Sequence, residues 1–158
     1  MDSIIIKPHH FLDIIKLHGA GLDLFVPDEK MGHDFYKIGN LILENPNVLM
    51  KLTLGADDIC TPCKYCENSV CIDELNIIPG YTKKNTYNKE LDRRIVEFFD
   101  LDLKREYKAS ELCQIYLSDP TFIYKVWEEE NEEATQKRYE LFIKGAEKYL
   151  SDYSDSNP

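Results

Sequence analysis

Four cysteines lie within twelve residues near the middle of this 158-residue chain, and they constrain its fold more than any other feature. They are Cys60, Cys63, Cys66 and Cys71, with the spacing C-x2-C-x2-C-x4-C. Thiolates are soft, strongly donating ligands suited to iron–sulfur clusters and to zinc. Two-residue gaps let a loop curl so that successive sulfurs converge on one centre. The spacing therefore predicts a metal-binding loop.

The same spacing bears on which metal the loop binds. Structural zinc sites usually join two cysteine pairs that lie a dozen or more residues apart. Here a third cysteine follows after only two residues, and the sequence holds no second pair. Three cysteines spaced in this way resemble the ferredoxin run, in which one loop holds three irons of a cubane. The pattern favours one [4Fe–4S] cluster, with Zn²⁺ and metal-free thiols as the alternatives.

The fourth iron of such a cluster has several candidate ligands. These are Cys71, the distant Cys113, a histidine, or no protein atom at all. Cys113 lies on a predicted helix, where a lone cysteine usually serves as a small buried hydrophobic residue. Four cysteine ligands predict electron transfer or redox sensing, whereas an open iron predicts a Lewis-acid site. The sequence leaves open whether the protein is an enzyme.

Composition and charge restrict the cellular location of the protein and the classes of partner that it can bind. The net charge of −10 disfavours nucleic-acid binding, because such a surface repels phosphate backbones. The longest apolar run, 4–6, is far too short to span a bilayer, and the N-terminus does not resemble a signal peptide. We therefore expect a cytoplasmic protein, where clustered thiols are reduced and available as ligands. The acidic surface serves either solubility alone or a basic redox partner; a small-molecule substrate is the other possible partner.

The apolar pattern predicts a mostly α (α+β) fold with about five to six helices and a small two-stranded ribbon. We expect one metal-binding domain over residues 1–150 and a disordered tail over 151–158. Alternation and β-branched residues predict paired strands at 4–6 and 48–54. Helical spacing, caps and prolines predict helices that begin near Pro8, Asp28, Leu91, Ser110, Pro120 and Glu132.

Two polar pairs are further candidate site residues. His9 and His10 stand at the start of the first predicted helix, where they act either as ligands or acid–base groups, or as plain capping residues. Adjacent helical residues point about 100° apart, so one of the two is expected to face the cysteine loop. Asp57 and Asp58 precede Cys60, where they either form a turn or orient a histidine through a hydrogen bond.

The other histidines and the familiar catalytic motifs add no further site. His18 and His33 have no supporting pattern and are predicted to be structural or exposed. The sequence contains no glycine-rich phosphate loop, nucleophile elbow or two-histidine metalloprotease motif. A cysteine hydrolase is disfavoured because no cysteine has an evident histidine partner.

Two motifs resemble the DUF1284 family of small bacterial and archaeal proteins of unknown function. They are Lys7-x-His9-His10-Phe11-Leu12 and Asp57-Asp58-Ile59-Cys60-x-x-Cys63. The resemblance covers roughly residues 5 to 150 and includes the stretches 127–129, 135–138 and 145–150. It implies iron–sulfur binding, which is suspected for the family, and a role for the histidine pair. Asp13 stands where relatives often have cysteine, and C-terminal cysteines found in some relatives are missing, so the resemblance implies a single cluster on the 60–71 loop.

Overall fold

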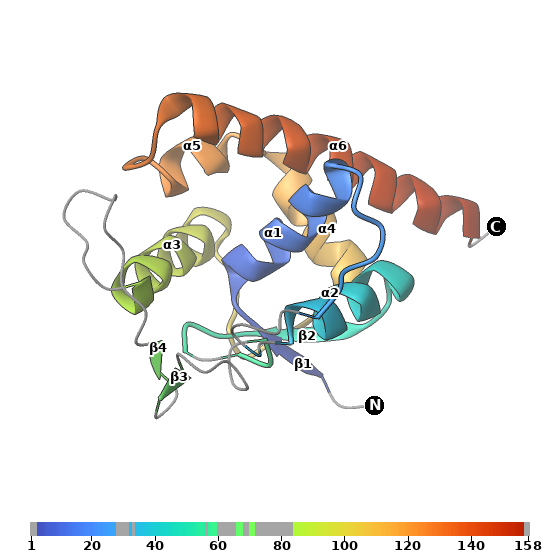
Figure 1. Cartoon of the computed structure of the whole chain (residues 1–158), viewed down its shortest axis with the longest axis horizontal. Coiled ribbons are helices and arrows are strands. Elements are labelled where there is room, and N and C mark those ends of the chain that lie inside the picture. The colour runs from blue at the N-terminus through green and yellow to red at the C-terminus, as the bar shows by residue number, and fades with distance from the viewer. Residues whose placement is uncertain are drawn as a thin grey trace.

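A computed structural model describes residues 3–27, 32, 34–55, 57–59, 66–67, 70–71 and 84–156. Six helices and five short strands lie in this part of the chain. Figure 1 shows a small sheet at one side of the molecule, the long C-terminal helix at the opposite side, and the first helix between them. The structure thus confirms a mostly helical fold with a minor β component.

The main sheet has the strand order β1-β2-β5. Strand β1 (Ile4–Ile6) pairs with β2 (Leu49–Leu52), as predicted, and the two run parallel. Strand β2 pairs antiparallel with β5 (Glu106–Lys108). Met50 and Leu52 are buried while their neighbours in β2 are exposed, which is the alternation expected of a strand covered on one face. Strand β5 was not predicted, because Tyr107 is its single buried residue and gives no alternating pattern.

The second pair of strands lies within the cysteine segment. Strand β3 (Cys66–Glu67) pairs antiparallel with β4 (Val70–Cys71), and β4 lies against helix α3. Where the sequence predicts one two-stranded ribbon, the described residues form a three-stranded sheet and a separate hairpin whose two strands have two residues each.

Helix α1 (Pro8–Gly19) connects the sheet to the rest of the molecule. Proline at its first position suits the start of a helix, because its missing N–H would have no helical partner there. The remaining helices are α2 (Phe35–Glu44), α3 (Lys84–Phe99), α4 (Ala109–Ser118), α5 (Phe122–Val126) and α6 (Glu132–Ser156). Helix α6 continues past Leu150, into the segment where the sequence predicts a disordered tail.

Helices α1 and α6 pack backbone to backbone. A Cβ added at Gly19 would collide with the carbonyl oxygen of Leu141, and one added at Gly145 would collide with that of Ile15. Only glycine permits this approach. A cluster of aromatic rings then fills the core between α1, α3, α4, α5 and α6; its members are Phe11, Phe99, Tyr116, Phe122 and Phe142.

Polar contacts of the core fix the helix ends. The Tyr116 hydroxyl donates to the carbonyl of Pro8 over 3.1 Å, and the Tyr149 hydroxyl donates to that of Ile42 over 2.7 Å. No helix in the described ranges is both long and apolar enough to cross a membrane.

Candidate functional site

The predicted cysteine loop is described only at its second half. Cys60 and Cys63 lie outside the described residues, so the structure does not test their role. Cys66 and Cys71 stand directly opposite each other in the backbone register of the β3–β4 hairpin. The metal centre on the four cysteines therefore stays a prediction. The structure does describe the residues immediately before Cys60 and their contacts with the first helix.

Asp57 fastens the start of the cysteine loop to the first helix. One carboxylate oxygen, Oδ2, accepts hydrogen bonds from the backbone N–H of Lys7 and from Nδ1 of His10, both over 2.7 Å. The other oxygen accepts the backbone N–H of Ile59 over 3.1 Å. The Asp57 side chain is fully buried. Both roles that the sequence suggested for this residue, the turn and the histidine partner, are present together.

Asp58 and Ile59 extend this anchor. The backbone N–H of Ile5 donates to the Asp58 carboxylate over 2.8 Å, and the Asp58 N–H donates to the carbonyl of Ile5 over 2.9 Å. These bonds occupy the outer edge of β1. Ile59 is buried, and its carbonyl accepts the N–H of Asp34 at the start of α2. Three consecutive residues immediately before Cys60 are thus held by β1, α1 and α2.

His9 is bound by a residue that the sequence analysis did not identify. Oδ1 of Asp92, in α3, accepts both the backbone N–H of His9 over 2.7 Å and its ring Nδ1 over 2.8 Å. The Asp92 side chain is completely buried. It thereby caps the first turn of α1 from another helix and fixes the orientation of the His9 ring. A signal existed: Asp92 is an acidic residue on the buried stripe that Tyr87, Leu91 and Ile95 define along α3.

The two histidines form a close pair with the same hydrogen-bonding pattern. Their ring centroids are 4.4 Å apart and the planes are tilted by 48°. Each Nδ1 is bound to a carboxylate, which favours the tautomer with the proton on Nδ1 and the lone pair on Nε2. Within the described ranges, neither Nε2 forms a hydrogen bond. The two Nδ1 atoms bind different parts of the chain, since His10 reaches Asp57 and His9 reaches α3, while the expectation that one histidine faces the cysteine loop stays a prediction.

The surroundings shift the pKa values of the two histidines in opposite directions. Burial lowers the pKa of His9, but the charge and hydrogen bond of Asp92, together with the charge of Asp13, outweigh it, so the net pKa lies above the ordinary 6.5. Burial and the neighbouring His9 lower the pKa of His10, and Asp57 offsets only part of this. Near neutral pH, His9 is therefore the ring that more readily carries a proton, and His10 is the ring that more readily stays neutral.

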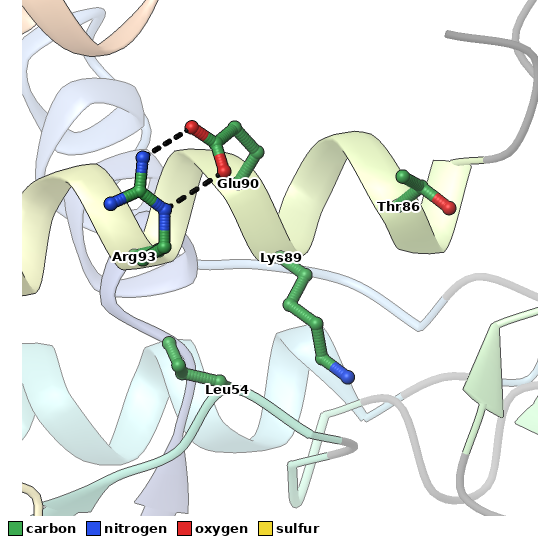
Figure 2. A pocket seen from close by; sticks show the side chains of 5 residues that line it. All are labelled: Leu54, Thr86, Lys89, Glu90 and Arg93. Carbon is green, nitrogen blue, oxygen red and sulfur yellow. Dashed lines mark hydrogen bonds and ion pairs between the residues drawn. The ribbon is translucent and has the colours of Figure 1, made fainter.

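An open cavity of about 430 Å³ lies between α3 and the segment that leads to Asp57. Figure 2 shows Lys89 reaching from α3 toward the segment of Leu54, with Arg93 and Glu90 paired on the helix above. Lys89 forms no ion pair with any described residue. The described lining of this open cavity carries both signs of charge, positive from Lys89 and Arg93 and negative from Glu90.

The remaining candidates are structural or fall outside the described residues. Cys113 is fully buried and unpaired, and burial raises the pKa of its thiol to about 12. His18 is buried, with Nδ1 2.9 Å from the carboxylate of the exposed Asp23, and His33 is not described. Among described residues, no group of three or more histidine, cysteine and acidic side chains is arranged to hold a metal ion.

A family model matches residues 28–126, which is more than half of the chain, and its description is a protein of unknown function, DUF1284. The chain belongs to the DUF1284 family. The matched range includes the anchored Asp57–Ile59 segment, the cysteine loop and Asp92; it is narrower than the resemblance inferred from the motifs, and it begins after His9 and His10. Comparison with curated proteins and with solved structures finds no match.

Proposed function

We propose that this DUF1284 protein binds one [4Fe–4S] cluster through Cys60, Cys63, Cys66 and Cys71. The observation that carries the proposal is the donor set, four thiols at a spacing that suits a cubane. When bound, the cluster would supply one-electron transfer or redox sensing, or a Lewis-acid iron if Cys71 does not ligate. A cytoplasmic location, where thiols stay reduced, belongs to the same proposal.

The geometry around the loop supports a built site rather than a loose tail of cysteines. Asp57, Asp58 and Ile59 are each bonded to a different element immediately before Cys60. At the far end of the loop, the hairpin register brings Cys66 opposite Cys71, and β4 lies against α3. A loop held at both ends loses less conformational entropy when it closes around a cofactor.

Asp57 and the histidine pair would serve the site through charge and protons. A carboxylate beside anionic thiolates would be unfavourable unless its charge were shared, and Asp57 shares it with two backbone N–H groups and with His10. We assign to His9, His10, Asp57 and Asp58 a supporting role, as acid–base groups or as hydrogen-bonding neighbours of the ligands. The cavity beside Leu54 supports a small-molecule substrate, and the net charge of −10 suits a basic redox partner.

Anaerobic purification followed by analysis of iron, sulfide and zinc tests the proposal. We expect brown protein with iron and sulfide in equal amounts, lost in Cys63→Ser and retained in Cys113→Ala. Cys113 is the matched control because it lies in the core, on α4. A folded, oxygen-protected sample with zinc in place of iron would favour a structural zinc module that mediates protein interaction. A folded sample with no metal would end both interpretations.

The same sample distinguishes electron transfer from Lewis-acid chemistry. Cys71→Ala should change the electron paramagnetic resonance spectrum of the reduced protein if all four cysteines bind iron. A spectrum unaffected by this substitution would leave one iron without a cysteine ligand, and would point to a site open to substrate.

A further inference from the structure

We propose that His9 and His10 form a second, mononuclear site that binds a divalent ion of the zinc, cobalt and nickel class through their Nε2 atoms. This inference is independent of the cluster, because it uses no cysteine. It rests on the orientation of the two rings, on the burial of their carboxylate partners, and on the distance between the rings.

The orientation of both rings is the one that metal-binding histidines adopt. Such histidines almost always donate their second ring N–H to a carboxylate or carbonyl, which fixes the ring and makes the coordinating nitrogen more basic. Here both Nδ1 atoms are bound to carboxylates over 2.7 and 2.8 Å, and both Nε2 atoms are without a hydrogen bond in the described structure.

The burial of the two carboxylates argues against a purely capping role. Burying a carboxylate is costly, and capping α1 would require only that the backbone N–H of His9 donate to Asp92. Instead, two fully buried carboxylates from two different elements each bind an imidazole ring. The second oxygen of Asp92 is buried and has no hydrogen-bond partner in the described structure, so the hydrogen bonds of this carboxylate there go to His9.

His18 provides the contrast within the same helix. Its Nδ1 also lies near a carboxylate, that of Asp23, but this side chain is 65% exposed and is shared with Lys148. The carboxylate beside His18 is therefore one that solvent reaches. His9 and His10, by comparison, are held in position by partners that water does not reach.

The separation of the rings is close to the value that one ion requires when its two ligands lie at a right angle. With a metal–nitrogen distance of about 2.1 Å, two imidazoles around one ion have ring centres about 4.6 Å apart at a right angle and about 5.3 Å apart at the tetrahedral angle that zinc prefers. The observed separation is 4.4 Å, and the rings are tilted rather than stacked. Imidazole nitrogen favours zinc, cobalt and nickel over magnesium and calcium, which prefer oxygen.

The ligand count sets the character of the site. No third histidine, cysteine or acidic residue of the described ranges completes a group around the ion. Two protein ligands leave the other positions to water or to a bound small molecule, so the ion would be exchangeable and able to act as a Lewis acid.

Zinc titration of the full chain tests the inference. The protein is purified anaerobically and keeps any metal that is bound to the cysteine loop. Calorimetry should detect one added site, whose affinity falls at least tenfold in His10→Gln and about tenfold or more in Asp92→Asn, which keeps an acceptor for Nδ1 but removes the charge. His18→Gln is the matched control and should leave the affinity unchanged. Nitrogen NMR of the rings should show Nε2 of His9 and His10 shifting with zinc while His18 does not.

Two results would overturn the inference. One is a wild-type protein in which saturating zinc shifts neither ring, and the other is an affinity that His10→Gln leaves unchanged. The ring signals of the wild-type protein decide the matter even if a variant does not fold. Iron measured on the same samples keeps the proposals separate, because a chain without iron whose rings still respond to zinc would contradict only the cluster.

Discussion

The two ends of α1 are built on opposite principles. At the C-terminal end, Gly19 meets Gly145 with no side chain between the helices, and the contact tolerates no added atom. At the N-terminal end, His9 and His10 are surrounded by carboxylates, a lysine and backbone donors, joined by hydrogen bonds of 2.7–2.8 Å. One end is fixed by shape and the other by charge and hydrogen bonding.

This difference teaches how the fold positions its candidate site. Close packing against α6 restricts α1 to one placement, because neither backbone can shift without opening a gap. Asp57 and Asp92 can then meet the first turn of α1 from two directions with little further loss of entropy. The polar end thus depends on the apolar end, and substitutions at the two ends should differ in both size and character.

The largest effect is expected at the close helix contact. Gly145→Ala places a Cβ against the carbonyl oxygen of Ile15, so the helices must separate. We expect a loss of about 3 kcal/mol in the free energy of unfolding, the upper part of the range for overpacking. Urea unfolding measures it. Gly55→Ala is the control, since its Cβ would meet only Thr53 Oγ1 at 3.7 Å; equal stability of the two variants would contradict the close packing.

A smaller loss is expected when the anchor of the cysteine loop is weakened. Asp57 accepts three donors on two oxygens, whereas asparagine offers one oxygen and adds a donor. Asp57→Asn therefore leaves at least one buried donor unpaired, and should lower the free energy of unfolding by about 2 kcal/mol. Asp23→Asn, in the exposed pair with His18, should leave the thermal midpoint nearly unchanged. A midpoint equally unaffected in Asp57→Asn would show that the anchor contributes nothing.

The smallest effect concerns the charge on His9. In Asp92→Asn the burial that lowers the pKa of His9 remains, while the charge that raises it is gone, so this pKa should fall below 6.5. Titration of the ring by NMR measures it, with His18 as the internal reference. A pKa of His9 that stays raised in the variant would mean that Asp92 is not the cause.

The same substitution changes how stability depends on pH. In the wild type, the raised pKa of His9 contributes stability that is complete below pH 6.5 and is lost as pH rises through the folded-state value. The lowered pKa of His10 contributes in the opposite sense, above pH 6.5, and this is lost as pH falls through its folded-state value. The deficit of Asp92→Asn relative to wild type should therefore be greater below pH 6.5 than above it. Unfolding at two pH values measures the difference.

Local patterns account for most of what the sequence predicted about the fold. Each of three elements depends on a few neighbouring residues: proline at the start of α1, the apolar stripe of α2 and the alternation of β2. All three elements are present. Residues 60–65 lie outside the described part of the chain, so the metal centre that the cysteine spacing predicts is not tested by the fold. Strand β5 was missed because one buried tyrosine between two charged residues has no period.

The sequence alone determined the helical class, the pairing of the first two strands and a cysteine spacing suited to a metal, because each depends on neighbours along the chain. Only the tertiary structure decided that Asp92 binds His9 across 83 positions, and that Gly19 meets Gly145. Contacts of this kind join single residues from distant elements. A lone aspartate or glycine becomes informative only when packing brings its partner to it.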